Sequence, residues 1–384
     1  MEDKSQETAK VAYTVNRLGI FAFYDKEGTA DAYVFHLLDS MAEIVEKLII
    51  VVNGTVCGEC LRRFCTYTEN VVIRENIGYD AGAYKEILLS LARAHELDQW
   101  DEMVLFNDTF YGPFFGWQEI FEEMRGKNVD FWGLSKWLKG RSELFGGELQ
   151  EHLQSYFLVI GRRMLASSVF LEFWRSLDNI STYRDAIYNF EVMFTVYHLK
   201  HGFKYASWLD KNDTYVKTGE VAYCAHPFDL IKNCRFPILK RKAMSATNFV
   251  QAGAALQYIE NNYNYSTDMI WQHIERVGES LSDHRFTFRE IEHFVHSHRK
   301  IYIYGYGKWG HAMESLFAYK GWAIAGMIDS DETKQNRFVR KLQDVKPEPE
   351  DGMVVALGKE SFWEVYPQLK GIFKEDQLLL PNFK

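Results

Sequence analysis

The chain has 384 residues, of which 47% are hydrophobic and 25% are charged, and its formal net charge is −9. This length predicts two domains, and the composition is ordinary for a soluble globular protein. The acidic balance excludes nucleic acid as an expected partner, because nucleic-acid binding needs a basic surface. No apolar run reaches the roughly 18 residues of a membrane-spanning helix, and residues 1–10 lack the apolar centre of a signal peptide. We therefore expect a cytoplasmic protein.

The first half of the chain alternates β-branched apolar runs, typical of buried strands, with segments of helical periodicity. The predicted strands are residues 18–24, 48–52, 71–74, 103–106, 129–132 and 156–160. The predicted helices are residues 30–47, 84–95, 117–125, 164–177 and 191–202. This alternation predicts an α/β fold with a mainly parallel sheet and flanking helices. The polar, glycine-rich residues 140–147 are predicted to be a mobile loop.

The second half changes character after residue 245. Residues 246–299 are polar and helical in pattern, which predicts a helical connector. Residues 300–384 then predict a small Rossmann-like α/β module, because Gly305, Gly307 and Gly310 follow a strand pattern and Asp329 ends the next one. NAD or another nucleotide is the ligand that this fingerprint suggests, although the glycines could serve helix–strand packing alone. The expected division is thus a polar tail at 1–17, a domain at 18–245, the connector and the module.

Polar residues and glycines follow the predicted strands of the first half, where parallel strands bring their carboxyl ends to one edge of the sheet. They are Tyr24, Asp25, Asn53, Arg74, Asn76, Gly78, Asp80, Gly82, Asn107 and Asp108. Glycines allow close approach of a ligand, and the oxygens of a strand-terminal Asn-Asp suit Mg²⁺ or Mn²⁺ bridging phosphates. The combination predicts a nucleotide-diphosphate site.

Plainer roles exist for three of these residues. Asp108 could cap the turn that leads into residues 111–113, and Asp80 could cap the helix that follows it. Arg74 could bind phosphate or form a surface ion pair. Elsewhere, Cys57 and Cys60 have zinc-knuckle or redox spacing, but no second Cys pair or nearby His completes a metal set. We expect them to be reduced thiols in a polar loop after the second strand.

The segment from about 18 to 240 resembles the rhamnan-synthesis F family of bacterial polysaccharide glycosyltransferases. Six blocks carry the resemblance in the family's order: residues 19–25, 50–54, 75–84, 105–113, 130–134 and 152–157. The resemblance implies a GT-A-like transferase that uses a nucleotide sugar. It implies that Asp108 binds the metal, although the usual Asp-x-Asp is replaced here by Phe-Asn-Asp. The strand-end residues named above, from Tyr24 to Asn107, would then bind the donor.

The same resemblance suggests which residues act on the acceptor. Glu191 is the first choice for the base that takes the acceptor's hydroxyl proton in an inverting transfer, with Asp130 as its competitor. We expect apolar surroundings to raise the pKa of Glu191. Further expected participants are His152 for the acceptor or the metal, and Gln154, Ser155 and Trp132 for acceptor binding. Three of these residues could instead have structural roles. His152 could be a hydrogen-bonded residue of the core, and Trp132 could simply pack in the core. Glu191 could interact favourably with the dipole of the helix that it begins.

These expectations combine into one leading function. The chain would extend a cell-envelope polysaccharide from a nucleotide sugar, with rhamnose the sugar that the family name implies. The acceptor would be lipid-linked or polysaccharide, which makes contact with the inner face of the cytoplasmic membrane an expected property. Two alternatives stay open: a sugar-modifying oxidoreductase that uses NAD(P) in the C-terminal module, and a non-catalytic scaffold in polysaccharide assembly.

Overall fold

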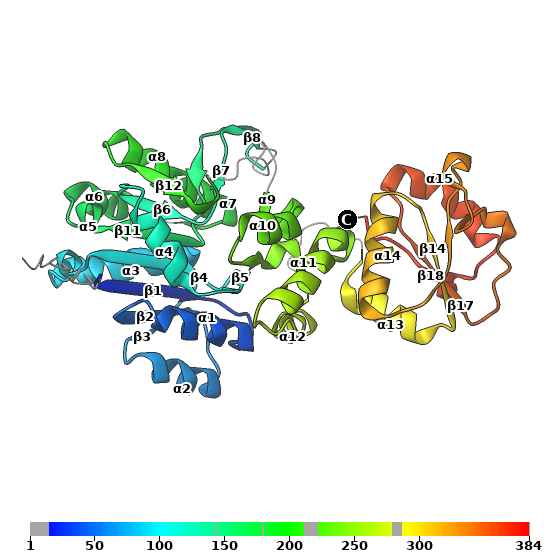
Figure 1. Cartoon of the computed structure of the whole chain (residues 1–384), viewed down its shortest axis with the longest axis horizontal. Coiled ribbons are helices and arrows are strands. Elements are labelled where there is room, and N and C mark those ends of the chain that lie inside the picture. Colours follow the sequence, from blue (N-terminus) through cyan, green and yellow to red (C-terminus); the bar gives the residue numbers. More distant parts are fainter. Residues whose placement is uncertain (1–14, 143, 179, 211–221, 279–285, 384) are drawn as a thin grey trace, which may run out of the picture. The chain divides into compact units, whose positions relative to one another are not determined.

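The structure, a computed structural model, describes residues 15–142, 144–178, 180–210, 222–278 and 286–383. The chain forms two compact units, each interrupted in sequence (Figure 1). Unit 1 comprises residues 1–29, 38–108 and 117–210, and unit 2 comprises residues 30–37, 109–116 and 211–384. The division after residue 210 precedes the boundary expected at 245. Most of the predicted polar tail, residues 1–14, lies outside the described residues.

Unit 1 is built on a seven-stranded sheet. In sheet order the strands are β12 (Tyr205–Ser207), β6 (Phe131–Gly133), β11 (Phe157–Gly161), β4 (Glu102–Asn107), β1 (Arg17–Phe23), β2 (Lys47–Asn53) and β3 (Val71–Arg74). All neighbours pair in parallel except β11, which runs antiparallel to both β4 and β6. The expectation of an α/β fold with a mainly parallel sheet is confirmed in this unit.

Both faces of this sheet are covered by helices, and the alternation of side chains along β1 shows why. Leu18 and Ile20 belong to a core shared with α3 (Tyr79–Arg93), α6 (Ser168–Ser176) and α8 (Met193–Lys200). Phe21 and Phe23 point to the other face, where Phe23 meets Phe64 of α2 (Gly58–Tyr67) with ring centroids 5.3 Å apart. The central strand is therefore apolar along nearly its whole length because it is buried on both sides.

Several elements differ from their predicted bounds for local reasons. The helix predicted at 164–177 is divided into α5 (Arg162–Leu165) and α6, because Ser167 caps α6 through its side chain. The helix predicted to begin at Glu191 follows a π-helical segment, η2 (Ala186–Val192), and α8 comes after it. Within the predicted loop at 140–147, of which residue 143 lies outside the described residues, β8 (Gly140–Ser142) pairs antiparallel with β9 (Gly147–Leu149). α1 (Ala32–Ala42) and α4 (Trp117–Arg125) complete the larger helices of this half.

Short strand pairs add to both units. In unit 1, β7 (Lys136–Trp137) pairs antiparallel with β10 (His152–Leu153), which holds the segment before β11 in place. In unit 2, β5 (Phe110–Tyr111) pairs antiparallel with β13 (Leu239–Lys240). Residues 109–116 thus join unit 2 although they follow β4 of unit 1 directly in sequence.

Unit 2 combines helices with a second sheet. Its larger helices before the sheet are α10 (Pro227–Cys234), α11 (Phe249–Asn262), α12 (Asp268–Val277) and α13 (Phe288–Ser297). The sheet has the order β16 (Val339–Arg340), β15 (Ile324–Ile328), β14 (Lys300–Tyr304), β17 (Asp351–Val355) and β18 (Leu378–Leu379), and all pairs are parallel. The helices α14 (Lys308–Lys320) and α15 (Lys359–Lys370) connect its strands. Across the described ranges, no helix has both the length and the apolarity to cross a membrane.

Candidate active site

The polar residues predicted at strand ends gather at one edge of the sheet of unit 1. Asn53 is the last residue of β2, Arg74 the last of β3 and Asn107 the last of β4, and Asp108 follows directly. Because these strands are parallel, their carboxyl ends share one edge. Asn107 and Asp108 are 6% and 5% exposed, so both polar side chains are enclosed by protein.

Asp80 joins this group from the first turn of α3. Its carboxylate accepts a hydrogen bond from Asn107 Nδ2 at 2.9 Å and another from the amide of Ala81 at 2.9 Å. Burial is the main cause that raises the pKa of Asp80 to about 6; the charge of Glu191 adds to it, and the bond from Asn107 opposes it. The carboxyl group therefore sits in an environment with too little positive charge to hold its anion easily.

Arg74 and Asn53 form the frame behind this group. Arg74 donates to Asn53 Oδ1 at 2.5 Å and to the carbonyl of Ile77 at 2.8 Å, and it pairs with Glu86 at 2.8 Å. Asn53 Nδ2 in turn donates to the carbonyl of Tyr79 at 3.0 Å. All three guanidinium nitrogens of Arg74 are engaged within the protein. The alternative of an ion pair therefore describes Arg74 better than a phosphate contact.

The glycines of this segment are explained by the chain itself. Gly78 precedes α3 with φ of 80°, a conformation that favours glycine. A Cβ at Gly82 would lie 2.2 Å from the carbonyl oxygen of Ile77, so only glycine lets α3 pass this close to the loop before it. The expected close approach exists, but the group that approaches is the protein's own backbone.

Glu191 lies in the π-helical segment η2, and the predicted acceptor residues surround it. Both the amide and the hydroxyl of Ser155 donate to Glu191 Oε2 at 2.8 Å. His152 Nε2 is 3.8 Å from Glu191 Oε1, and its Nδ1 bonds the carbonyl of Gln150 at 2.7 Å. Since a carbonyl only accepts, Nδ1 carries a hydrogen and Nε2 is the nitrogen turned toward Glu191. π-Helical turns occur often at functional sites, and this one places a carboxylate beside a histidine.

The expectation that apolar surroundings raise the pKa of Glu191 is wrong. Burial does oppose its ionisation, but hydrogen bonding and charge from His152 and the two donors of Ser155 outweigh it and lower the pKa. Glu191 is therefore a carboxylate held in its ionised form by specific donors. Ser155 was expected to bind the acceptor. In the structure its amide and hydroxyl hold the carboxylate of Glu191 in place.

Gln154 belongs to a buried network beneath the same segment. Ser135 Oγ donates to Gln154 Oε1 at 2.7 Å and lies 2.6 Å from the hydroxyl of Tyr156. Thr195 Oγ1 accepts from the amide of Leu153 at 3.0 Å. These contacts fix the segment 152–156 between the sheet and α8, and they account for the burial of Gln154 without a ligand.

Tyr24 and Asn76 keep ligand-binding capacity. Tyr24 follows β1 and is 47% exposed, so its ring is accessible for stacking on a planar group. Asn76 Oδ1 is buried and has no hydrogen-bond partner among the described residues. Asp25 instead accepts from the amides of Glu27 and Thr29, each at 2.9 Å, which assigns it to a turn.

Two predicted site residues lie elsewhere. Asp130 precedes β6, which runs parallel to β4, so it lies at the amino-terminal edge of the sheet, opposite Asp108. It pairs with two nitrogens of Arg163 at 2.5 Å, and this guanidinium holds its pKa below the usual range. The ring of Trp132 is 5% exposed and packs edge-on against Phe121. Asp130 is thus a structural ion-pair partner and Trp132 a core residue.

Tyr84 adjoins the candidate site, and sequence reasoning did not single it out. It lies one helical turn after Asp80 on the same face of α3. Its hydroxyl is buried and has no hydrogen-bond partner among the described residues. Burial first, and then the charges of Asp80 and Asp108, raise its pKa well above the usual value. The sequence could have indicated Tyr84 through its position four residues after Asp80, because residues at this spacing share one face of a helix.

The donor set fits a divalent cation that phosphate would help to hold. Asp80, Asp108 and Glu191 are acidic, and burial together with the charge of Glu191 raises the pKa of Asp80. Within the described ranges, no three His, Cys, Asp or Glu side chains converge at metal-ligand spacing. Mg²⁺ commonly takes one or two carboxylates and completes its shell with water and substrate phosphates. Asp108 and Asp80 could supply these carboxylates, and Asn107 holds Asp80 through a hydrogen bond.

Most of the glycine-rich loop of unit 2 is explained by contacts within the protein. A Cβ at Gly305 would lie 2.7 Å from the carbonyl oxygen of Ala356, and one at Gly310 would lie 1.8 Å from that of Gly305. A Cβ at Gly307 would meet nothing within 4 Å. Asp329 accepts from the amide of Tyr306 at 2.7 Å and pairs with Lys334 at 3.3 Å. Packing and loop closure therefore account for Gly305, Gly310 and Asp329 but not for Gly307, and these contacts give NAD no support.

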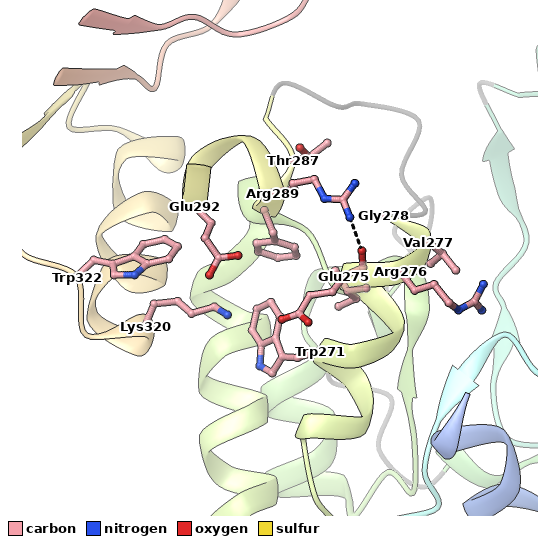
Figure 2. A pocket seen from close by; sticks show the side chains of 12 residues that line it. Trp271, Glu275, Arg276, Val277, Gly278, Thr287, Arg289, Glu292, Lys320 and Trp322 are labelled. Atoms are coloured by element: carbon pink, nitrogen blue, oxygen red, sulfur yellow. Dashed lines mark hydrogen bonds between the residues drawn. The ribbon is translucent and has the colours of Figure 1, made fainter. Parts of the chain in front are cut away.

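A pocket of about 480 Å³ lies within unit 2, between α12, α13 and the end of α14 (Figure 2). Lys320 Nζ lies 3.9 Å from the ring centroid of Trp271, and Arg289 donates to the carbonyl of Glu275 at 2.9 Å. None of the predicted site residues lines this pocket. We assign it no role.

The raised pKa of Asp80 predicts a pH-dependent stability difference between the protein and Asp80→Asn. The folded-state pKa of about 6 exceeds the ordinary 3.8, so the folded protein binds this proton more tightly than the unfolded chain. The carboxyl group's contribution is therefore present below about pH 4 and lost as the pH rises through 6. Relative to the variant, the protein should lose about 2–3 kcal/mol over this range in metal-free buffer. Urea unfolding at several pH values measures it, and a constant difference would contradict it.

The fold and the site define an α/β protein with a partly buried acidic group at the carboxyl edge of a mainly parallel sheet. The sequence profile of the family described as Rhamnan synthesis protein F matches residues 48–304, which is more than half of the chain. The chain belongs to this family. It is also 25% identical over 178 residues to the uncharacterized protein y4gN of Sinorhizobium fredii. That match covers 46% of this chain and 44% of the relative, so the chain spans less than half of the relative's length.

Two solved structures show limited similarity. Glucosyl-3-phosphoglycerate synthase from Mycobacterium tuberculosis, solved with Mg²⁺ and uridine diphosphate, is 14% identical with a TM-score of 0.26, covering 39% of this chain and 57% of that one. HddC from Yersinia pseudotuberculosis is 10% identical with a TM-score of 0.26, covering 43% and 88%. These scores are too low to bear on what this chain does.

Proposed function

We propose that the chain is a glycosyltransferase that moves a sugar from a nucleotide-sugar donor to a growing polysaccharide. The observation that carries this proposal is the group of Asp80, Asn107 and Asp108 at the carboxyl edge of the sheet, where the charge of Glu191 acts on Asp80. Membership of the rhamnan synthesis family supports it and makes rhamnose the first donor sugar to test, with a cell-envelope polysaccharide as product.

The donor's nucleotide would lie across the ends of β1 to β4. The exposed ring of Tyr24 offers a stacking surface for the base, and the unpartnered Oδ1 of Asn76 offers an acceptor for a hydroxyl. The guanidinium nitrogens of Arg74 are engaged within the protein, and Asp25 Oδ1 closes a turn. The diphosphate would then approach Asp108.

Asp108 and Asp80 would hold a divalent cation, which supplies positive charge to the departing nucleoside diphosphate. Asn107 keeps Asp80 in place through a hydrogen bond of 2.9 Å. Burial of these groups strengthens their electrostatic interactions, because little water screens them. The raised pKa of Asp80 fits this role, since an added cation would restore the anion.

Glu191 would accept the proton of the attacking hydroxyl. Two donors from Ser155 fix Oε2, which leaves Oε1 beside His152 for the proton. The lowered pKa keeps Glu191 ionised at neutral pH and therefore ready to accept, although it makes the carboxylate a weaker base. Once protonated, Glu191 would return the proton to solvent before the next turnover.

A donor screen by thermal shift tests the proposal. The full chain is heated with each of several nucleotide sugars, dTDP-rhamnose included, with and without Mn²⁺. A ligand at 100 times its dissociation constant should add about 2.7 kcal/mol of stability. We expect at least one donor to stabilise the chain only when the metal is present. Stabilisation by NAD(P) alone would favour an oxidoreductase, and no stabilisation by any nucleotide would contradict the proposal.

A further inference from the structure

The two cysteines after β2 lie at the start of a helix, and not in the polar loop that the sequence suggested. Cys57 is the N-cap of α2, and its sulfur accepts a hydrogen bond from the amide of Cys60 at 3.2 Å. The carbonyl of Cys57 accepts from the amide of Leu61 at 2.9 Å, which is the first helical bond. Cys57 therefore occupies the position at which a side chain meets the unpaired amides of a helix start.

The spacing suits a disulfide. Positions i and i+3 of a helix have Cα atoms about 5 Å apart by helix geometry, and natural disulfides join Cα atoms about 4.4–6.8 Å apart. The Cys57 sulfur already touches the backbone of Cys60, and the thiol of Cys60 also hydrogen-bonds it. Both the separation expected of the two Cα atoms and the contact of the Cys57 sulfur with the amide of Cys60 therefore suit a disulfide.

Cys57 is also the more reactive of the pair. Hydrogen bonds from the thiol and the amide of Cys60 lower the pKa of the Cys57 thiol, against opposing contributions from burial and from Glu59. The thiolate is the form that attacks disulfides. Cys57 is half-buried, while Cys60 is 6% exposed, so an external reagent reaches Cys57 first.

We propose that Cys57 and Cys60 are a reversible dithiol–disulfide pair that exchanges with low-molecular-weight disulfides such as oxidised glutathione. The Cys57 thiolate attacks one sulfur of glutathione disulfide, which forms a mixed disulfide and releases one glutathione thiolate. Cys60 then loses its proton and attacks the Cys57 sulfur, which breaks the mixed disulfide and releases the second glutathione. Both cysteines are oxidised, and one glutathione disulfide is reduced to two thiols.

The other three cysteines lack this arrangement. Cys65 lies in the same helix but is exposed and has no cysteine three residues away. Cys234 is 3% exposed, and burial raises the pKa of the Cys224 thiol to about 11. Oxidation should therefore modify Cys57 and Cys60 in preference to the other three cysteines. The amide of Cys57 donates to the carbonyl of Gly28 at 2.7 Å, so the pair lies where the segments after β1 and β2 meet.

The experiment equilibrates the full chain with glutathione buffers of increasing oxidised fraction, followed by acid quenching, alkylation and peptide mass spectrometry. Both cysteines lie in one tryptic peptide, residues 48–62. We expect this peptide to lose two hydrogens and both alkylation sites together, and to regain them with reduced glutathione. Cys60→Ala should trap glutathione on Cys57 alone, whereas Cys57→Ser should leave Cys60 unmodified. Cys65→Ser is the matched control and should leave the transition unchanged.

Three results would overturn the proposal. The first is a peptide 48–62 that keeps two free thiols under conditions in which Cys65 becomes glutathionylated. The second is a disulfide that joins Cys57 or Cys60 to another cysteine in the folded chain. The third is equal rates of glutathionylation at Cys57 and Cys65 in Cys60→Ala. Because the readout is covalent mass, none of these results depends on whether the chain transfers sugar.

Discussion

Asp108→Asn is expected to abolish metal-dependent donor binding and to lower sugar transfer by roughly 10³-fold, because metal-assisted charge stabilisation is worth several kcal/mol. Asparagine keeps the size of the side chain, so the fold should persist. The measurement is turnover at fixed Mn²⁺ together with a donor titration. Asp98→Asn is the matched control, because Asp98 is exposed in a 3₁₀ turn, η1 (Leu97–Gln99), that precedes the amino-terminal end of β4.

The outcome at Asp108 separates two roles. If it binds the metal, added Mn²⁺ should no longer stabilise the variant in the presence of donor. If it caps a turn instead, unfolding measurements should show lost stability while donor binding by the remaining folded protein persists. Unchanged turnover in Asp108→Asn would end the assignment of Asp108 as the metal ligand.

Glu191→Gln should cut transfer by about 10²- to 10⁴-fold, the usual contribution of a general base. Donor affinity should barely change, because the amide oxygen of the introduced glutamine can still accept the two hydrogen bonds that Ser155 donates to Glu191 Oε2. Steady-state kinetics with varied donor and acceptor measure the two effects separately. Glu172→Gln, at an exposed position of α6, is the matched control.

Two results would contradict the role of Glu191. An equal loss of donor affinity and rate would make it a binding or structural residue. A product that retains the anomeric configuration of the donor would remove the need for this base. The lowered pKa adds a further expectation, since protonation of Glu191 should not slow transfer until the pH falls below the ordinary pKa range of a glutamate.

The sheet could be predicted from the sequence because its central strands, β1, β2 and β4, are buried on both faces. Such strands need continuous apolar runs, and these runs are visible without any tertiary information. The parallel direction of the strands then placed Asn53, Asn107 and Asp108 at one edge. This geometric rule, and not any property of the single residues, made the clustering of these side chains predictable.

The remaining features depend on contacts between distant segments. Nothing near Asp130 in the sequence indicates that Arg163 will neutralise it. Trp132 lies within a strand whose inward and outward faces are set by the neighbouring β11 and α4, so its burial could not be read from its own segment. The π-helical turn at Glu191 and its donors from Ser155 arise from packing between η2 and the segment before β11.

The central claim is sugar transfer at the group of Asp80, Asp108 and Glu191. Its most direct test is nucleoside diphosphate release from the donor that the thermal-shift screen selects, measured with the full chain, Mn²⁺ and a polysaccharide acceptor. We expect release that requires both metal and the intact chain, is lost in Asp108→Asn and Glu191→Gln, and is accompanied by a sugar added to the acceptor. Release that persists undiminished in both variants, or donor binding with no sugar transferred to any acceptor of a polysaccharide panel, would contradict it.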